Sequence, residues 1–264
     1  MFFDLPYGVK VDKYLAGMPT TRWLTWTNPR NEYSNAIILA AGGGSGGNGA
    51  NVSFSYYAGC SGGFAHIYCP LSLLPDTLYI QVALGGLGVS GARSAGRTGG
   101  TTYISMYPSI STANLLIACA GGGGGADANS AIAGGGAVTI HNTFGIAQGY
   151  TGGSGGSWNI GYSAFGGSSL PTTGSPIYGG SGSAYVGGGD MISVSSLYPT
   201  FTWPQGNRNG SVLQKPFTVF GGYGANTCCS GGFNGIMGAG GGGGGESSQI
   251  SGKGGDGFVT IICY

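Results

Sequence analysis

The residues that could carry chemistry are few, and their spacing forms no familiar catalytic site. Gly86-Leu87-Gly88-Val89-Ser90-Gly91 satisfies the GxGxxG pattern of dinucleotide-binding turns, but the turn-rich sequence that follows predicts no helix to hold a phosphate. The letters of GxSxG occur around Ser45 and Ser154, again without the helix that a nucleophile elbow requires. We therefore expect no enzymatic activity, no catalytic residue and no cofactor.

The titratable side chains favour structural roles. His66 and His141 are the two histidines, and His66 lies on an alternating, strand-like segment where a structural histidine is expected. The eight carboxylates include no close pair suited to general acid–base work. Asp256, between glycines, is expected to form a turn.

Six cysteines occur without a CxxC pair, which favours small buried hydrophobic residues over disulfides. They are Cys60, Cys69, Cys119, Cys228, Cys229 and Cys263. Metal ligation by the adjacent pair Cys228 and Cys229 would need further ligands that the sequence does not provide, so no metal site is expected.

The composition is far from that of an ordinary soluble domain. Glycine supplies 61 of 264 residues, and charged residues make up 6%, against roughly 25% in typical domains. Hydrophobic residues at 41% and aromatic residues at 12% argue against disorder. The chain must therefore fold with a surface of small polar residues and tyrosine.

The net charge of +1 excludes whole classes of partner. Binding to nucleic acid needs clustered Lys and Arg, and residues 128–189 contain no charged side chain. Electrostatic targeting to membranes is disfavoured for the same reason, and no apolar run is long enough to span a bilayer. A near-zero charge favours association, so we expect the chain to work within an assembly.

Residues 1–21 differ from the rest of the chain. They contain Asp4, Lys10, Asp12 and Lys13 but little glycine, and they lack the basic and apolar regions of a secretion signal. Two interpretations remain open, a docking arm and a short N-terminal strand of the main domain. We assign 1–21 as an arm or docking segment and 22–264 as a glycine-rich domain.

Short apolar segments with β-type patterning recur along the chain, and no segment shows helical periodicity with caps. Strands are expected over 22–27, 35–41, 64–69, 78–84, 101–106, 114–120, 137–141, 191–203, 217–220 and 258–264. The fold class is therefore all-β. The segments NAIILAAGGG and NLLIACAGGGGG are near copies, which indicates an internal two-fold pattern.

Glycine runs directly follow several of these apolar segments, at 42–44, 121–125, 134–136, 187–189 and 240–245. Glycine serves where backbone packs on backbone or where φ is positive. Extended glycine chains with a threefold, polyproline II-like geometry can lie side by side and bond laterally. We expect a sheaf of polyglycine II-like helices flanked by short strands, with the glycines as the most buried backbone.

The order of these elements is similar to a known family. NAIILAAGGGSGG is followed by CSGGFAHIYCPLSLLPDTLYIQVALGGLG, then GRTGGTTYISM, LLIACAGGGGG and GKGGDGFVTIICY. This series resembles the glycine-rich domain of bacteriophage tail fibres, tail-fibre-tip adhesins and related virion proteins. The resemblance implies a polyglycine sandwich whose loops touch the host receptor, and a homotrimer if the chain forms a fibre.

Aromatic residues within a Gly-, Ser- and Asn-rich stretch are the candidate receptor contacts, because this is the composition of antibody-like binding loops. They are Tyr150, Trp158, Tyr162, Phe165, Tyr178 and Tyr185. The alternative is that these rings cover the edges of the glycine sheaf.

The sequence and the resemblance together predict a phage virion protein, a tail fibre, spike or adhesin, that binds the host surface through polar-aromatic loops on a rigid scaffold. Its partners would be other virion proteins, through the N-terminal segment, and a protein or glycan receptor, with no nucleic acid. It would be made in the host cytoplasm and located in the virion. The alternative is a structural virion protein that decorates capsid or tail without binding a receptor.

Overall fold

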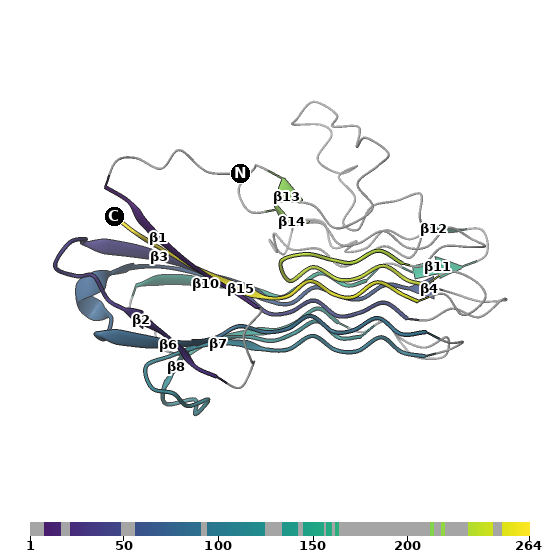
Figure 1. Cartoon of the computed structure of the whole chain (residues 1–264), viewed down its shortest axis with the longest axis horizontal. Helices are drawn as coiled ribbons and strands as arrows, with labels where there is room; N and C mark the ends of the chain where they lie inside the picture. Colours follow the sequence, from purple (N-terminus) through teal and green to yellow (C-terminus); the bar gives the residue numbers. More distant parts are fainter. Residues whose placement is uncertain are drawn as a thin grey trace.

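The chain folds as an all-β protein, seen in a computed structural model (Figure 1). The structure describes residues 8–16, 22–48, 56–90, 94–124, 134–141, 145–155, 157–159, 162–163, 212–213, 218–219, 232–244 and 250–264. These residues contain no α-helix, and the single helical turn among them is the 3-10 turn η1.

Most strands belong to two antiparallel five-stranded sheets, ordered β1-β15-β3-β5-β10 and β2-β6-β7-β8-β9. We call them sheet A and sheet B. A three-stranded sheet β12-β11-β4 and the pair β13-β14 complete the set. The elements are β1 (Lys10–Leu15), β2 (Leu24–Thr27), β3 (Asn35–Ala41), β4 (Tyr56–Tyr57), β5 (Phe64–Pro70), η1 (Leu71–Leu73), β6 (Thr77–Gln81), β7 (Thr102–Ser105), β8 (Leu115–Cys119), β9 (Val138–Ile140), β10 (Ile146–Tyr150), β11 (Ser157–Asn159), β12 (Tyr162–Ser163), β13 (Val212–Leu213), β14 (Thr218–Val219) and β15 (Phe258–Cys263).

Sheets A and B pack face to face around one apolar core. Alternate residues of each strand point inward, as the period of two requires, so Ile38 of β3, Ile80 of β6 and Ile117 of β8 are all 0% exposed. Trp26 of β2 is part of this core, and its indole Nε1 donates to Asp12 Oδ2 of β1 at 2.9 Å. Trp26 therefore fastens the β1 edge of sheet A to the β2 edge of sheet B.

Glycine-rich segments continue the strands beyond the sheets and run side by side along the long axis of the molecule (Figure 1). We call this part the glycine half, and the two five-stranded sheets the strand half. The segments of the glycine half are residues 42–48, 58–63, 82–90, 94–101, 120–124, 134–137, 151–155, 232–244 and 250–257.

The residues between the two halves become progressively smaller. β3 ends in Ala40-Ala41 before Gly42, and β8 ends in Ala118-Cys119 before the next run. At this point a side chain links the two sheets directly, because Thr102 Oγ1 of sheet B donates to Ala41 O of sheet A at 2.6 Å. The two near-copy segments thus lie in different sheets, β3 in sheet A and β8 in sheet B, and both continue into glycine.

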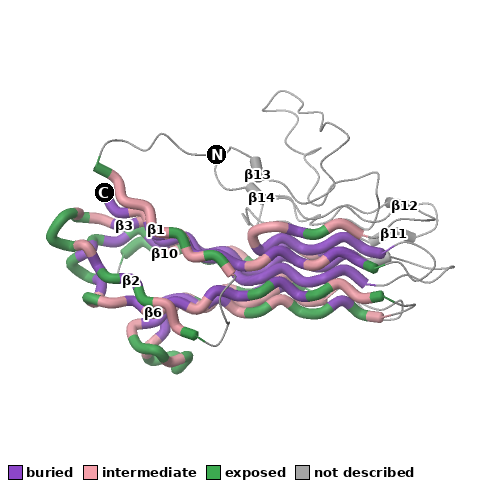
Figure 2. Tube along the Cα trace, in the orientation of Figure 1, coloured by how far each residue is buried: buried purple, intermediate pink, exposed green. Residues whose placement is uncertain are grey.

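Residues 42–48, which we call the central run, are buried along their whole length (Figure 2). Their backbone N–H groups donate to three neighbouring segments in rotation, so that residues three apart bond to the same neighbour. The donor–acceptor pairs are Gly42–Gly63 and Ser45–Cys60 at 2.9 Å, Gly43–Gly100 at 3.1 Å and Gly46–Arg97 at 3.0 Å, and Gly44–Gly255 at 2.8 Å and Gly47–Gly252 at 3.0 Å.

The carbonyls of the central run accept from three further segments. The acceptor–donor pairs are Gly43–Gly122 at 3.0 Å, Gly44–Gly86 at 2.8 Å, and Ser45–Gly241 and Asn48–Gly244 at 2.9 Å. The central run is therefore hydrogen-bonded to six neighbours, which satisfy most of its buried backbone groups without a sheet.

The three-residue rotation equals the three residues per turn of a polyproline II-type chain. The same period governs exposure on outer segments, where Leu84, Leu87 and Ser90 are exposed and the residues between them are more buried. The polyglycine II geometry of the runs stays a prediction, and backbone torsion angles from NMR chemical shifts would test it.

Glycine serves here by lacking a Cβ rather than by adopting positive φ. Among the described glycines, φ is positive at Gly8 and Gly238. In the central run, a Cβ built on any of the five glycines would lie closer than 3.0 Å to the backbone of another segment. Real Cβ atoms do not approach backbone so closely, so each of these positions requires glycine.

A candidate binding surface at the far end of the glycine half

Two segments far apart in sequence meet at the end of the glycine half that lies away from sheets A and B (Figure 1). There β11 pairs with both β4 and β12. The register places Trp158 opposite Tyr56 on one side and Ser163 on the other, and Asn159 opposite Tyr162. We call β4, β11 and β12 the distal sheet, and its aromatic positions are Tyr56 and Tyr57 of β4, Trp158 of β11 and Tyr162 of β12.

Backbone packing in the glycine half sets the position of the distal sheet. Residues 58–63 lead from β4 to β5, and residues 151–155 lead from β10 to β11. Ser61 ties these two segments together, because its N–H donates to Gly153 O at 3.0 Å and its Oγ accepts from Gly153 N at 2.7 Å. These two hydrogen bonds align the segments so that Ser157 of β11 lies opposite Tyr57 of β4.

The approach of the two segments also depends on missing side chains. A Cβ on Gly155 would lie closer than 3.0 Å to the backbone of Ala58, and one on Gly152 would meet the backbone of Ser61 equally closely. The missing Cβ atoms of these glycines therefore help to set the position of the distal sheet.

Tyr150, predicted as a receptor contact, lies elsewhere. It ends β10 in sheet A, where its ring stacks on Phe64 at a centroid distance of 6.3 Å and contacts His66 at 5.7 Å. Phe64 is buried and packs with Phe258 and Leu39 in a second, smaller apolar cluster. Tyr150 is half-buried against this apolar cluster of sheet A.

The other predicted contacts divide into two groups. Trp158 and Tyr162 are placed in the distal sheet by backbone register, whereas Phe165, Tyr178 and Tyr185 lie outside the described residues. Tyr56 and Tyr57 were missed as candidates. The sequence signal for them is the pair of adjacent tyrosines just before the run 58–63, at the same distance from a strand as Trp158 on the paired segment.

Tryptophan does not act uniformly as a surface residue. Trp26, unlike the candidate contact Trp158, is a core residue and is 2% exposed. Its place on an alternating strand, inward-facing with Leu78 and Ile80 of the paired strand β6, explains the difference.

The groups considered for chemistry are held in structural contacts. His66 lies among the rings of Phe64, Tyr68 and Tyr150, and burial lowers its pKa. The GxGxxG residues 86–90 form an extended outer segment, where Gly86 donates to Gly44 O at 2.8 Å. Within the described residues, no three His, Cys, Asp or Glu side chains group as metal ligands would.

Asp256 corrects one expectation, because it forms no turn. It lies in the extended segment 250–257, where its Oδ1 accepts from Gly85 N at 2.7 Å and from Lys253 Nζ at 2.8 Å. With three residues per turn, Lys253 and Asp256 share one face of the segment. The carboxylate thus links two glycine segments.

Four of the six cysteines are described, and all four are buried. Burial raises the pKa of Cys60, Cys69 and Cys263 to about 11, and that of Cys119 higher still. Cys69 and Cys263 both lie opposite Ala36, on either side of β3. Two strand spacings, roughly 10 Å, therefore separate them, too far for a disulfide.

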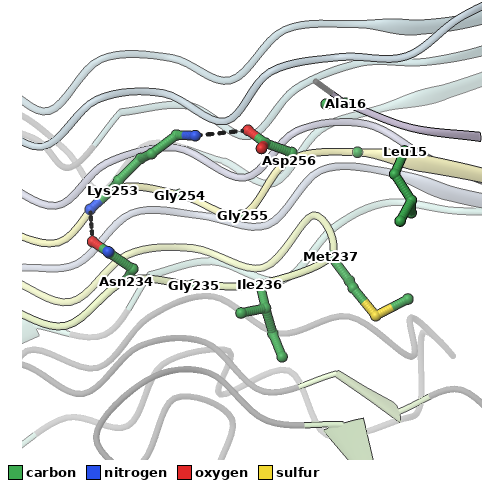
Figure 3. A pocket seen from close by; sticks show the side chains of 11 residues that line it. Leu15, Ala16, Asn234, Gly235, Ile236, Met237, Lys253, Gly254, Gly255 and Asp256 are labelled. Carbon is green, nitrogen blue, oxygen red and sulfur yellow. Dashed lines mark hydrogen bonds and ion pairs between the residues drawn. The ribbon is translucent and has the colours of Figure 1, made fainter. Parts of the chain in front are cut away.

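A cavity of about 410 Å³ lies where the end of β1 meets the glycine half (Figure 3). Leu15, Ile236 and Met237 contribute its apolar side chains, and Lys253 and Asp256 form an ion pair beside it. Because that pair is internally neutralised, the cavity presents no unpaired charge from these two groups to a ligand.

The fold defines an all-β scaffold built on packed glycine segments, with aromatic positions collected at one end. The family model of a glycine-rich domain matches residues 19–264. The chain belongs to this glycine-rich domain family, and β1 lies before the matched region. No curated protein matches the chain. No helix among the described residues has the length and apolarity needed to cross a bilayer.

Proposed function

We propose that this protein is a phage virion protein, a tail fibre, spike or adhesin, that binds the host cell surface without chemical reaction. The proposal rests on the resemblance of its ordered segments to phage tail-fibre domains. It is supported by one structural observation, the register of the distal sheet, which places Trp158 directly opposite Tyr56, with Tyr162 opposite Asn159 on the next strand. Tyr and Trp provide large contact area with little loss of conformational entropy, which suits a binding surface.

The rigidity of the scaffold contributes to this proposal. Binding is weakened when loops must be ordered at the same moment, and a preorganised surface avoids that cost. The segments that deliver the distal sheet are hydrogen-bonded to their neighbours along their length. The receptor would be a protein or a glycan, and aromatic faces suit both.

The test uses fluorescently labelled chain applied to a panel of bacterial cells. We expect saturable binding to some strains, reduced at least about tenfold in affinity by Trp158→Ala or Tyr162→Ala, as for aromatic hot spots. The matched control is Tyr107→Ala. Tyr107 is 62% exposed in the loop between β7 and β8, at the opposite end of the strand half.

Equal binding by all three variants would contradict receptor contact through the distal sheet. If no strain shows saturable binding, the result would instead favour the structural virion role. That alternative is supported by exposed apolar side chains in the strand half, since Tyr107, Ile110 and Ile146 are 60–75% exposed. Such residues would be covered in an assembly.

A further inference from the structure

β1 is a peripheral strand that pairs with the rest of sheet A on one side only. It lies at the edge of sheet A, and its six residues pair antiparallel with β15, from Lys10 opposite Cys263 to Leu15 opposite Phe258. The family match begins at residue 19, after β1. The glycine-rich domain therefore ends in a strand, β15, whose outer edge is filled by a segment from outside the matched domain.

β1 contacts the core through half-buried side chains, among them Tyr14, which packs on it. None of its residues is fully buried, and Leu15 is 60% exposed. Beyond the backbone pairing, Asp12 accepts from the Trp26 indole at 2.9 Å, and the Tyr14 hydroxyl donates to Thr25 O at 3.4 Å. Trp26 itself is buried in the core, so the site that receives β1 is made largely by the domain.

We propose that β1 is an exchangeable strand, and that the β15 edge together with Trp26 accepts β1 from a second copy of this chain. Exchange of an identical element preserves every contact, so it costs little beyond the opening of the connection. An uncovered sheet edge is a ready template for an added strand.

Asp12 would set the register of the exchanged strand. A slip by one residue turns every side chain to the opposite face, which would remove the carboxylate from Trp26 and leave the indole N–H without this acceptor. Lys10, 3.1 Å from Asp12, and exposed Lys13 disfavour non-specific pairing of the same edge. The inference concerns assembly between copies and does not depend on receptor binding.

The experiment mixes two full-length variants that each add one cysteine, Lys13→Cys and Thr260→Cys, at positions that stand opposite each other in the β1–β15 register. One variant carries a mass tag. The mixture is warmed below its unfolding temperature, treated with a short bis-maleimide crosslinker and resolved by size. If β1 exchanges, this mixture should give several times more crosslinked heterodimer than a control pair, Lys13→Cys with Gln148→Cys. Gln148 suits the control because it is exposed and lies on β10, the edge strand of sheet A farthest from β1.

The native thiols do not obscure this result. The four described cysteines are buried, and each variant crosslinked alone gives the background from Cys228 and Cys229. Adding Asp12→Ala to the Lys13→Cys chain should lower the heterodimer several-fold, whereas Asp12→Asn, which keeps an acceptor oxygen, should retain most of it.

A double variant with both substitutions in one chain completes the design. If it crosslinks within the chain while the mixture gives heterodimer only at the control level, β1 docks solely on its own domain and the proposal fails. If the double variant does not crosslink either, β1 does not occupy the β15 edge, and the proposal fails at its first step. Equal heterodimer with Asp12→Ala would overturn the register role of Asp12.

Discussion

In the strand half, cohesion comes from large apolar side chains such as Ile38, Ile80 and Ile117, all 0% exposed, whereas the equally buried central run contains no side chain larger than asparagine. Both regions belong to the same continuous segments, since β3 passes directly into the central run. In the strand half, side chains fill the space between the two sheets. In the central run, most residues have no side chain, and backbone packs directly against backbone.

This contrast shows that burial and side-chain packing are separable. The central run is buried because six neighbours bond to its amides and carbonyls. Glycine ordinarily weakens regular structure because of its conformational freedom. In the central run it is stabilising, because its missing Cβ permits a network of backbone hydrogen bonds, each of which contributes about 1 kcal/mol. The two halves should therefore respond in opposite ways to changes in side-chain size.

The largest effect is expected from adding one methyl group to the central run. In Gly44→Ala the new Cβ would collide with the backbone of Gly238 and Ala239. Because rigid backbone cannot yield as a side chain can, we expect a loss of about 4 kcal/mol or more of unfolding free energy. Urea unfolding followed by circular dichroism measures it, and wild-type stability would refute close glycine packing.

Removing side-chain volume should be damaging in the strand half. Ile117→Ala empties part of the core between the sheets, and a loss of about 3 kcal/mol is expected. The same urea titration measures this loss. A single transition with unchanged slope in both this variant and Gly44→Ala would show that the halves unfold together, whereas two resolved transitions would show that they are independent.

Ser45 tests the hydrogen-bond network of the central run itself. Its Oγ donates to Gly123 O and accepts from Cys60 N at 2.8 Å, at a fully buried position. Ser45→Ala leaves the Cys60 N–H without this acceptor, and a loss of about 2 kcal/mol is expected. A change below about 0.5 kcal/mol in the unfolding free energy would show that the hydroxyl is not needed there.

Alkaline pH should weaken both halves through their thiols. The pKa of Cys60 in the glycine half and of Cys69 in the strand half is raised by burial from 9.0 to about 11. As pH rises, these thiols lose their protons in the unfolded chain before they do so in the folded chain. Their contribution to the free energy of unfolding is therefore complete below pH 9 and is lost as pH rises toward 11. Unfolding at pH 8 and pH 10.5 tests this, and Cys60→Ala and Cys69→Ala should each reduce the pH dependence. An unchanged dependence in either variant would show that its thiol is not the group that titrates.

The smallest effect is expected at the rim of the glycine half. Among the described residues, a Cβ on Gly134 would meet no heavy atom within 4 Å. Gly134→Ala should therefore change the unfolding free energy by less than about 0.5 kcal/mol, and it serves as the matched control for Gly44→Ala. A loss comparable to that of Gly44→Ala would mean that glycine is required for conformation rather than for space.

The all-β class was predictable because β-type apolar segments such as Asn35–Ala41 and Phe258–Cys263 carry a strong local signal. The end of β6 at Gln81 was not predicted. Val82 to Leu84 continue the apolar pattern, but they bond in the glycine half, where Leu84 O accepts from Gly100 N. Residue type does not reveal where a chain changes from sheet pairing to lateral packing.

The candidate site was less predictable, because it depends on which distant segments meet. Trp158 and Tyr162 attract attention as aromatic residues in a polar stretch, yet the pairing of β11 with Tyr56–Tyr57 depends on contacts such as Ser61 with Gly153. Tyr150 has the same local composition but packs on Phe64. Composition alone does not distinguish these two outcomes.

Amide hydrogen exchange of the central run tests the central claim most directly. If backbone bonding to six neighbours holds the glycine half, the amides of Gly43, Gly44, Gly46 and Gly47 should exchange as slowly as that of Ile38 in β3, through global unfolding alone. Exchange of these four glycines at rates near those of an unstructured chain, with Ile38 still protected, would contradict it.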